Sequence, residues 1–171
     1  MKVDAELLVF ETFLDTRGSF REWYHSYPPN FLPRQANCSI SQKGVIRGIH
    51  STKPDKSQSK IIACLKGSIL DVVVNLRIGD ENFGKFEIFE LSSNESSSLL
   101  IGEHMGHGFL SLENDTIVTY LTDMEYSPEN EISIDPLDPE IGIPWNQSNP
   151  ILSSKDMNSL KLAQFKEKYG I

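Results

Sequence analysis

The 171-residue chain lacks long hydrophobic runs, a signal-peptide pattern and any excess of positive charge. No stretch approaches the ~20 apolar residues of a membrane helix, which predicts a protein that stays out of the membrane. The 16 Lys and Arg residues are outnumbered by 24 Asp and Glu residues, giving a net charge of −8. A general nucleic-acid binder needs a basic field, so this class is excluded.

Cysteine is also scarce, since Cys38 and Cys64 are the only two and neither belongs to a CxxC motif. This usage predicts reduced thiols packed as small apolar residues, although a single disulfide stays open. The simplest predicted location is the cytoplasm.

The length predicts one domain over residues 1–171. Short runs rich in Val, Ile, Phe and Leu alternate with turn residues, a pattern typical of β-strands in a sandwich or barrel. The predicted strands cover residues 7–14, 36–40, 60–65, 69–76, 85–91, 98–101, 108–112 and 116–121.

Two turn sequences predict β-hairpins, at residues 42–44 and 65–68. In the second, Gly67 is free to take a positive φ. The run at residues 69–74 is almost continuously apolar, so this strand should be central and covered on both faces.

The C-terminal part differs in composition. Five prolines between residues 128 and 150 predict a long extended segment, and Trp145 indicates that it is held against the body. An amphipathic helix is expected to begin near Ser153 and to include Phe165.

His50 is the first candidate for chemistry. It follows Arg47 and Gly48 at the end of an apolar run, and Lys60 is ten residues further on. Neighbouring cations favour the neutral form of a histidine, which is the form a general base requires. Taken alone, His50 would more often be a strand-end histidine with a satisfied hydrogen bond.

A metal centre is the main rival interpretation. Metal cupins usually carry His-x-His, but the residue two positions after His50 is Thr52. His104 and His107 are three apart, which is the wrong period for one face of a strand. We therefore expect no metal at this position.

Tyr120 and Tyr126 lie at the end of a predicted strand and in the loop that follows. Both could be half-buried aromatic residues with a hydrated hydroxyl group. Alternatively, one is a proton donor and the other a stacking platform for a base, and their spacing does not decide between these roles.

Several motifs occur in a fixed order: Asp15-x-Arg17-Gly18-x-Phe20-x-Glu22, Gln35-x-Asn37-x-Ser39, Arg47-Gly48-Ile49-His50 with Lys60, Gly67-x-x-x-Asp71-Val72, His107-Gly108-Phe109, Tyr120 with Tyr126-x-Pro128, Leu137-Asp138-Pro139, and Ser153-x-Lys155-Asp156. Together they resemble the dTDP-4-dehydrorhamnose 3,5-epimerases and the related dTDP-4-keto-6-deoxyhexose 3-epimerases. The resemblance runs nearly end to end.

The resemblance implies an all-β, cupin-like jelly-roll barrel with a short C-terminal helical segment, acting as a homodimer without a metal or cofactor. The implied substrate is a dTDP-sugar. The implied catalytic residues are His50 as base, Asp156 as its orienting carboxylate, Lys60 near the sugar ketone and Tyr120 as acid. The implied binding residues are Arg47 at the phosphates, Tyr126 on the thymine, Gln35, Asn37 and His107 in the site, and Arg17, Phe20 and Glu22 from the partner subunit.

Some positions depart from the family pattern. Ser51-Thr52 replaces the common Tyr-Gln, and residues 102–106 differ from the usual stretch before the histidine-glycine-phenylalanine motif. These changes affect the expected pocket wall, and hence the identity of the substrate. A 3-epimerase, a 3,4-ketoisomerase on the same fold and a non-catalytic sugar-nucleotide-binding jelly roll remain as alternatives.

Overall fold

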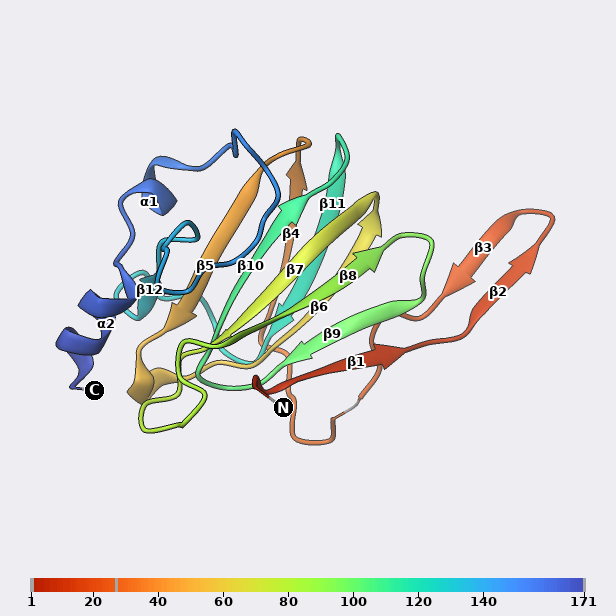
Figure 1. Cartoon of the computed structure of the whole chain (residues 1–171). Coiled ribbons are helices and arrows are strands. Elements are labelled where there is room, and N and C mark those ends of the chain that lie inside the picture. Colours follow the sequence, from red (N-terminus) through yellow and green to blue (C-terminus); the bar gives the residue numbers. More distant parts are fainter. Residues whose placement is uncertain (1, 27, 171) are drawn as a thin grey trace.

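Two five-stranded antiparallel sheets packed face to face form the body of the protein, in a computed structural model that describes residues 2–26 and 28–170 (Figure 1). The first sheet has the order β1 (Ala5–Val9), β9 (Ser97–Ile101), β6 (Lys60–Lys66), β11 (Thr116–Thr122) and β4 (Gln35–Ser41). The second has the order β12 (Glu131–Ser133), β5 (Ile46–Thr52), β10 (Met105–Ser111), β7 (Ser68–Asn75) and β8 (Phe86–Ser92). The expected all-β jelly roll is confirmed.

Both predicted hairpins are wrong. Strand β4 pairs with β11 whereas β5 pairs with β10 and β12, so the turn at residues 42–44 carries the chain from one sheet to the other. The turn at residues 65–68 likewise joins β6 to β7 in the opposite sheet. Gly67 does adopt a positive φ of 77°, as its turn position requires. The local turn was predicted correctly, but the pairing partners were not.

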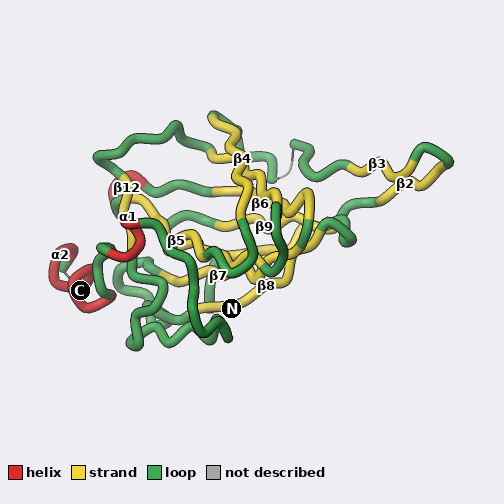
Figure 2. The backbone as a smooth tube through the Cα atoms, turned by 90° about the horizontal axis from the view of Figure 1, so that it is seen from above, coloured by secondary structure: helices red, strands yellow, loops and turns green. Residues whose placement is uncertain are grey.

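Most predicted strands lie close to strands of the structure, but the short strand β12 was not predicted, and one predicted run differs clearly. The run predicted at residues 7–14 is divided into β1 and β2 (Thr12–Asp15). Strand β2 pairs with β3 (Gly18–Arg21) in a two-stranded hairpin, here called the arm, that projects from the body (Figures 1 and 2). The chain therefore leaves the first sheet after β1, and residues 12–21 form a separate hairpin.

Hydrophobic packing occurs in layers on both sides of the second sheet. In β7, Val73 packs between the two sheets, whereas Val72 and Val74 pack against the C-terminal segment. This confirms that the strand is covered on both faces. On the outer face of the first sheet, Leu8 and Ile61 pack with Phe31 from the segment before β4.

The proline-rich C-terminal segment is held against the body as expected. Trp145 is buried, and its Nε1 donates a hydrogen bond to the Pro136 carbonyl oxygen at 2.8 Å. The predicted helix consists of two short helices, α1 (Ser154–Met157) and α2 (Leu162–Tyr169), because residues 158–161 leave the helical conformation. In Figure 2, these helices lie at the end of the molecule opposite the arm.

The two cysteines have different environments. Both are free thiols, and Cys64 is buried as predicted, but Cys38 is exposed. Cys38 belongs to the edge strand β4 and, like Ala36 and Ile40 on the same side of this strand, it is exposed. Within the described ranges, none of the helices is long and apolar enough to cross a membrane.

Candidate active site

A bulge in β5 brings Arg47 and His50 to the same face of the second sheet. His107 of β10 pairs with His50, but Phe109, two residues later, pairs with Arg47, so β5 has one extra residue here. Gly48 sits in the bulge with φ 110°, and a Cβ there would come within 2.5 Å of the His107 carbonyl oxygen. Glycine is therefore required for the close approach that directs both side chains between the sheets.

His50 contacts a buried carboxylate from the C-terminal segment. Its Nε2 lies 2.7 Å from Oδ1 of Asp156, which is 3% exposed. The other oxygen, Oδ2, accepts a hydrogen bond from the Ser153 hydroxyl at 2.8 Å, and Ser153 also caps α1. Burial alone would raise the pKa of Asp156, but the hydrogen bonds from His50 and Ser153 outweigh it and hold the pKa below its usual value. The result is an ionised aspartate paired with the imidazole.

Lys60 begins strand β6 and extends into the space between the sheets. Its side chain is almost completely buried, and burial lowers the pKa of its ammonium group to about 8. The carboxylates of Glu131 and Asp71 oppose this effect and raise the pKa. Lys60 is therefore still largely protonated at neutral pH, close to the point where it loses its charge.

A small chamber of about 140 Å³ lies between side chains that could take part in catalysis. It is lined by Ser39, Arg47, His50, Lys60, His107, Phe109 and Tyr120. Tyr120 is half-buried, and burial together with the negative charge of Glu131 raises the pKa of its phenol, partly offset by Arg47. The phenol is therefore neutral and able to donate a proton.

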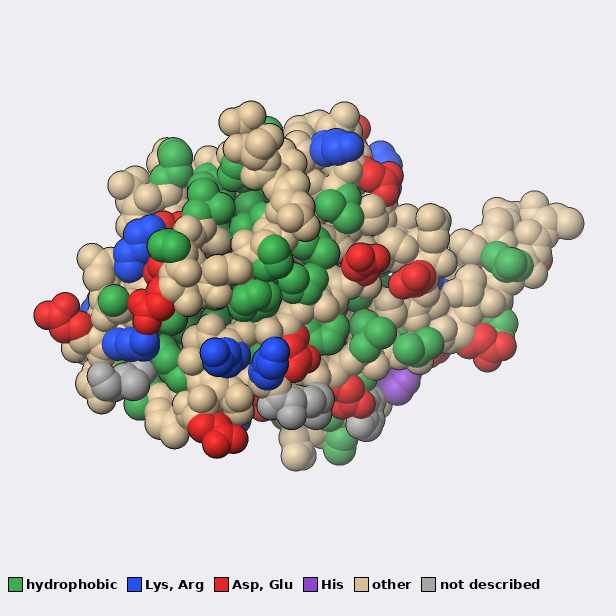
Figure 3. Space-filling model, viewed as in Figure 1, with side chains coloured by type: hydrophobic (Ala, Val, Ile, Leu, Met, Phe, Trp, Pro, Cys, Tyr) green, Lys and Arg blue, Asp and Glu red, His purple; other side chains and the backbone are tan. Residues whose placement is uncertain are grey.

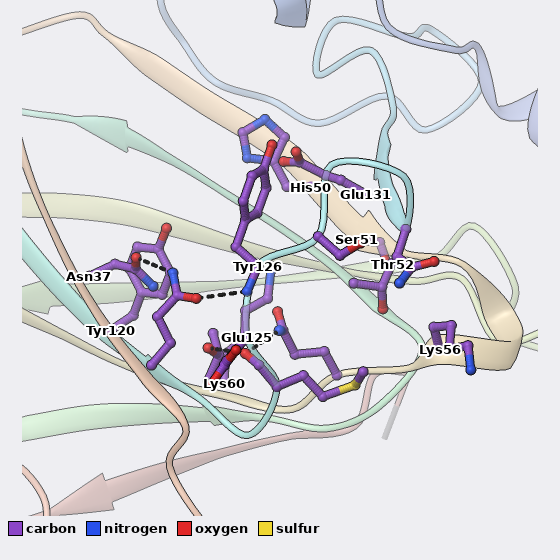
Figure 4. Close-up of a pocket in the computed structure, with 16 residues that line it drawn as sticks. Asn37, His50, Ser51, Thr52, Lys56, Lys60, Tyr120, Glu125, Tyr126 and Glu131 are labelled. Carbon is purple, nitrogen blue, oxygen red and sulfur yellow. Dashed lines mark hydrogen bonds between the residues drawn. The ribbon is translucent and has the colours of Figure 1, made fainter.

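A larger pocket of about 270 Å³ shares lining residues with this chamber, and Figure 4 shows the side chains around it. His50, Lys60 and Tyr120 line both spaces. Gln35 and Asn37 come from β4, and the side-chain nitrogen of Gln35 donates to Asn37 at 2.7 Å. The Gln35 oxygen accepts from the Tyr126 backbone N–H at 2.7 Å, which fixes the start of the Tyr126 loop.

His107 is linked to a second buried carboxylate. Its Nε2 lies 2.9 Å from Oδ2 of Asp71, which is fully buried on the adjacent strand β7. Asp71 belongs to a motif noted in the sequence, but no role was predicted for it. Only the pairing of β7 with β10 identifies it as a neighbour of the chamber.

Glu131 is a pocket residue that the sequence analysis missed. It is the first residue of β12 and lines the larger pocket together with Ser51, Thr52, Gln58 and Asn130. Nothing in the sequence distinguishes it from the other acidic residues, because its place depends on the pairing of β12 with β5.

Arg17, Phe20 and Glu22 lie elsewhere. Arg17 is in the turn of the arm, Phe20 is in β3 and 68% exposed, and Glu22 follows β3. None of the three lines either space between the sheets of its own chain. Eight of the 12 predicted site residues, by contrast, line one or both of these spaces, namely Gln35, Asn37, Arg47, His50, Lys60, His107, Tyr120 and Tyr126.

His50 and His107 each contact one aspartate. His104 lies in the turn before β10 with φ 65°, and its Nε2 is 3.9 Å from Glu103. Across residues 2–26 and 28–170, no group of three or more His, Cys, Asp or Glu side chains has an arrangement that could hold a metal ion.

The sequence profile of the dTDP-4-dehydrorhamnose 3,5-epimerase family matches residues 3–164. The chain belongs to this family. It is 38% identical to the dTDP-4-dehydrorhamnose 3,5-epimerase of Mycolicibacterium smegmatis, over 88% of this chain and 77% of the relative. It is 35% identical to the dTDP-4-dehydrorhamnose 3-epimerase of Streptomyces niveus, over 90% of this chain and 77% of the relative.

Solved structures of the family have the same fold. NovW, a 4-keto-6-deoxy sugar epimerase from the novobiocin cluster of Streptomyces spheroides, has a TM-score of 0.92 and 33% identity, covering 96% of this chain and 86% of that chain. ChmJ, a 3'-monoepimerase from Streptomyces bikiniensis solved with dTDP-quinovose, has a TM-score of 0.91 and 34% identity, covering 99% and 89%. The chain is thus an isomerase of the epimerase type, and its relatives include both 3,5- and 3-epimerases.

Proposed function

We propose that the protein is a dTDP-4-keto-6-deoxyhexose 3,5-epimerase of deoxysugar biosynthesis. The observation that supports this most directly is the chamber in which His50, Lys60 and Tyr120 meet. A proton on a carbon beside a ketone is weakly acidic, because the resulting anion delocalises onto the oxygen. Epimerisation needs a base, a group that stabilises the enolate oxygen, and an acid on the opposite face.

His50 is the proposed base. Because Nε2 faces Asp156 at 2.7 Å, Nδ1 is the ring nitrogen left to take the substrate proton. The imidazolium formed in this step is stabilised by the ionised Asp156, which also fixes the orientation of the ring. Asp156 acts without accepting the proton itself.

Lys60 is the proposed partner of the ketone oxygen. Its ammonium group, partly withdrawn from water, would stabilise negative charge that develops on this oxygen during proton abstraction. Tyr120 would then deliver a proton from the other face, since its raised pKa keeps the phenol protonated. His50 as base and Tyr120 as acid would act on both carbons that flank the ketone.

The remaining residues would bind the nucleotide and the sugar. Arg47 is suited to the diphosphate because a guanidinium group binds phosphate oxygens with two donors. The exposed ring of Tyr126 would stack on the thymine, and Gln35, Asn37 and His107 would contact the substrate within the site.

A homodimer would complete the nucleotide site with Arg17, Phe20 and Glu22 of the second subunit. The arm supports this proposal because Leu14 and Phe13 are 79% and 52% exposed. Figure 3 shows hydrophobic side chains in green on the projecting arm. Exposed apolar clusters of this kind mark surfaces that bind another protein. The free thiols agree with the cytoplasm as the expected compartment.

Deuterium exchange tests the proposed reaction. The protein would be incubated with dTDP-4-keto-6-deoxyglucose in heavy water with a chelator, and the sugar examined by NMR. We expect deuterium at both C3 and C5, and exchange about 10²- to 10⁴-fold slower with His50→Asn. Exchange at C3 alone would identify a 3-epimerase, movement of the ketone to C3 a ketoisomerase, and dTDP-sugar binding without exchange a non-catalytic protein.

A further inference from the structure

Arg21 connects the arm to the body of the protein. It is the last residue of β3 and therefore lies at the base of the arm. Its Nη1 donates hydrogen bonds to the carbonyl oxygens of Ser93 at 2.9 Å and Glu95 at 2.6 Å, and its Nη2 donates to that of Cys64 at 3.1 Å. Ser93 and Glu95 belong to the turn between β8 and β9, whereas Cys64 is in β6. One guanidinium group thus fixes the arm to a turn and to a strand of its own chain.

The arm carries two arginines with different surroundings. Arg17, in the turn at its tip, pairs with Asp15 of the arm itself, and the Arg17 side chain is 88% exposed. Arg21 is partly buried and binds backbone carbonyl groups of the body. A guanidinium group presents its donors as a planar fork, so it can bind carbonyl groups from two elements at once. These charge-assisted bonds are also stronger than bonds between neutral groups.

Two further hydrogen bonds hold the segments on either side of the arm. Before the arm, the Phe10 backbone N–H donates to the carbonyl oxygen of Ser96 at 2.7 Å. After the arm, the Ser98 hydroxyl donates to the carbonyl oxygen of Trp23 at 2.6 Å. The arm itself is a two-stranded hairpin that projects from the body (Figure 1), and such a hairpin is only marginally stable alone. Without the Arg21 side chain, the arm would stay attached but turn about these two points.

We propose that Arg21 is a positioning residue: it sets the direction in which the arm delivers its binding residues to the nucleotide site of a second subunit. This inference rests on the proposed epimerase function and its shared site. Successive side chains of a strand point to opposite faces, so Arg21 faces the body and Phe20 faces away from it. Phe20 and its cross-strand partner Phe13 are 68% and 52% exposed, with ring centroids 6.4 Å apart. The bonds of Arg21 therefore turn this apolar side of the arm outwards, as binding to a second copy requires.

The expected effect is on binding more than on chemistry. His50, Lys60 and Tyr120 belong to the body, so kcat at saturating substrate should stay within about twofold of wild type. The apparent Kd of dTDP, by contrast, equals the intrinsic Kd divided by the fraction of time that the arm holds the required direction. A freed arm that holds this direction for about a tenth of the time would raise Kd, and with it KM, about tenfold.

The first experiment compares Arg21→Ala with Lys66→Ala. Lys66 is exposed at the end of β6, two positions after Cys64, so the control removes the same charge near the same strand end. Calorimetric titration with dTDP should give a Kd about tenfold higher in Arg21→Ala and unchanged in Lys66→Ala. A rise of less than about threefold in folded Arg21→Ala would overturn the inference. If Arg21→Ala does not fold, Arg21→Gln replaces it under the same thresholds, because glutamine lacks the charge and the forked donors.

A mixed dimer tests whether Arg21 acts on the site of the partner. Arg21→Ala and His50→Asn chains are co-expressed with different tags and purified together. In this dimer, the base of the Arg21→Ala chain meets the intact arm of the His50→Asn chain, and the other site carries both defects. We expect the KM for deuterium exchange to return to the wild-type value, with about half of the wild-type kcat per dimer. A KM as high as that of Arg21→Ala would show that Arg21 acts within its own chain and would refute the proposed role.

Failure of the inference and failure of the proposed function give different results. Binding of dTDP needs no turnover, so it reports on Arg21 even in an inactive protein. Deuterium exchange by the wild type, without weaker dTDP binding in Arg21→Ala, would refute only the role of Arg21. Weaker dTDP binding in Arg21→Ala, together with no deuterium exchange by the wild type, would support the role of Arg21 in binding and refute the epimerase.

Discussion

Replacing Asp156 with alanine removes the carboxylate that contacts His50 at 2.7 Å. The hydrogen bond gains strength when His50 becomes an imidazolium, so its loss should affect proton abstraction more than substrate binding. A buried hydrogen bond to a charged group contributes about 1.5–3 kcal/mol. This corresponds to a decrease in kcat of roughly 10- to 150-fold, with KM changed less than about threefold. His50→Asn should be more severe, at about 10²- to 10⁴-fold, because the base itself is lost.

The assay is deuterium incorporation at C3 of the dTDP-4-keto-6-deoxy sugar, measured at saturating and subsaturating substrate. Ser153→Ala is the matched control, since it removes the other hydrogen bond to Asp156 and the α1 cap but leaves the contact with His50. That control should lose about 1 kcal/mol of stability and keep its exchange rate within a few fold.

A double variant tests whether Asp156 acts through His50. The His50→Asn/Asp156→Ala protein should exchange no more slowly than His50→Asn alone, because the carboxylate has no base left to orient. Wild-type exchange in Asp156→Ala would refute the reasoning. Fully multiplicative losses in the double variant would do the same, since they would show that Asp156 acts independently of the base.

Three further predictions concern stability, stereochemistry and assembly. The fall in the pKa of Lys60 from 10.5 to about 8 corresponds to a cost of roughly 3 kcal/mol below pH 8, since the unfolded chain binds the additional proton between pH 8 and 10.5. Lys60→Met should therefore raise Tm at pH 7 by up to roughly 6–12 °C in calorimetry while abolishing deuterium exchange. The gain in Tm should vanish above pH 10.5, and a lower Tm at pH 7 would contradict the prediction. Tyr120→Phe should keep deuterium exchange at C3 but lose inversion at C5, as seen by NMR, whereas full inversion at both carbons would exclude Tyr120 as the acid. Light scattering at micromolar concentration should give the mass of a dimer, and Phe20→Ser in the arm should weaken both dimerisation and dTDP binding; a wild-type monomer with full activity would refute the shared site.

The sequence by itself determined the strand content, the turns and the order of the motifs. Alternating and continuous apolar runs specify strands locally, because side-chain orientation repeats every two residues. The turn at Gly67 and the cap at Ser153 were likewise predictable, since each depends on the backbone preference or hydrogen bonding of one residue. The family and most pocket residues followed from the ordered motifs.

The tertiary structure decided which strands pair and which side chains meet. A turn sequence does not distinguish a hairpin from a crossing between sheets, because the pairing partner is selected by packing between distant segments. His50 and Asp156 are in contact although they are 106 positions apart in the sequence. Arg47 and His50 would lie on opposite faces of a regular strand, but the bulge at Gly48 brings them to the same face. Glu131 had no recognisable sequence signal, because its place in the pocket depends on the pairing of β12 with β5.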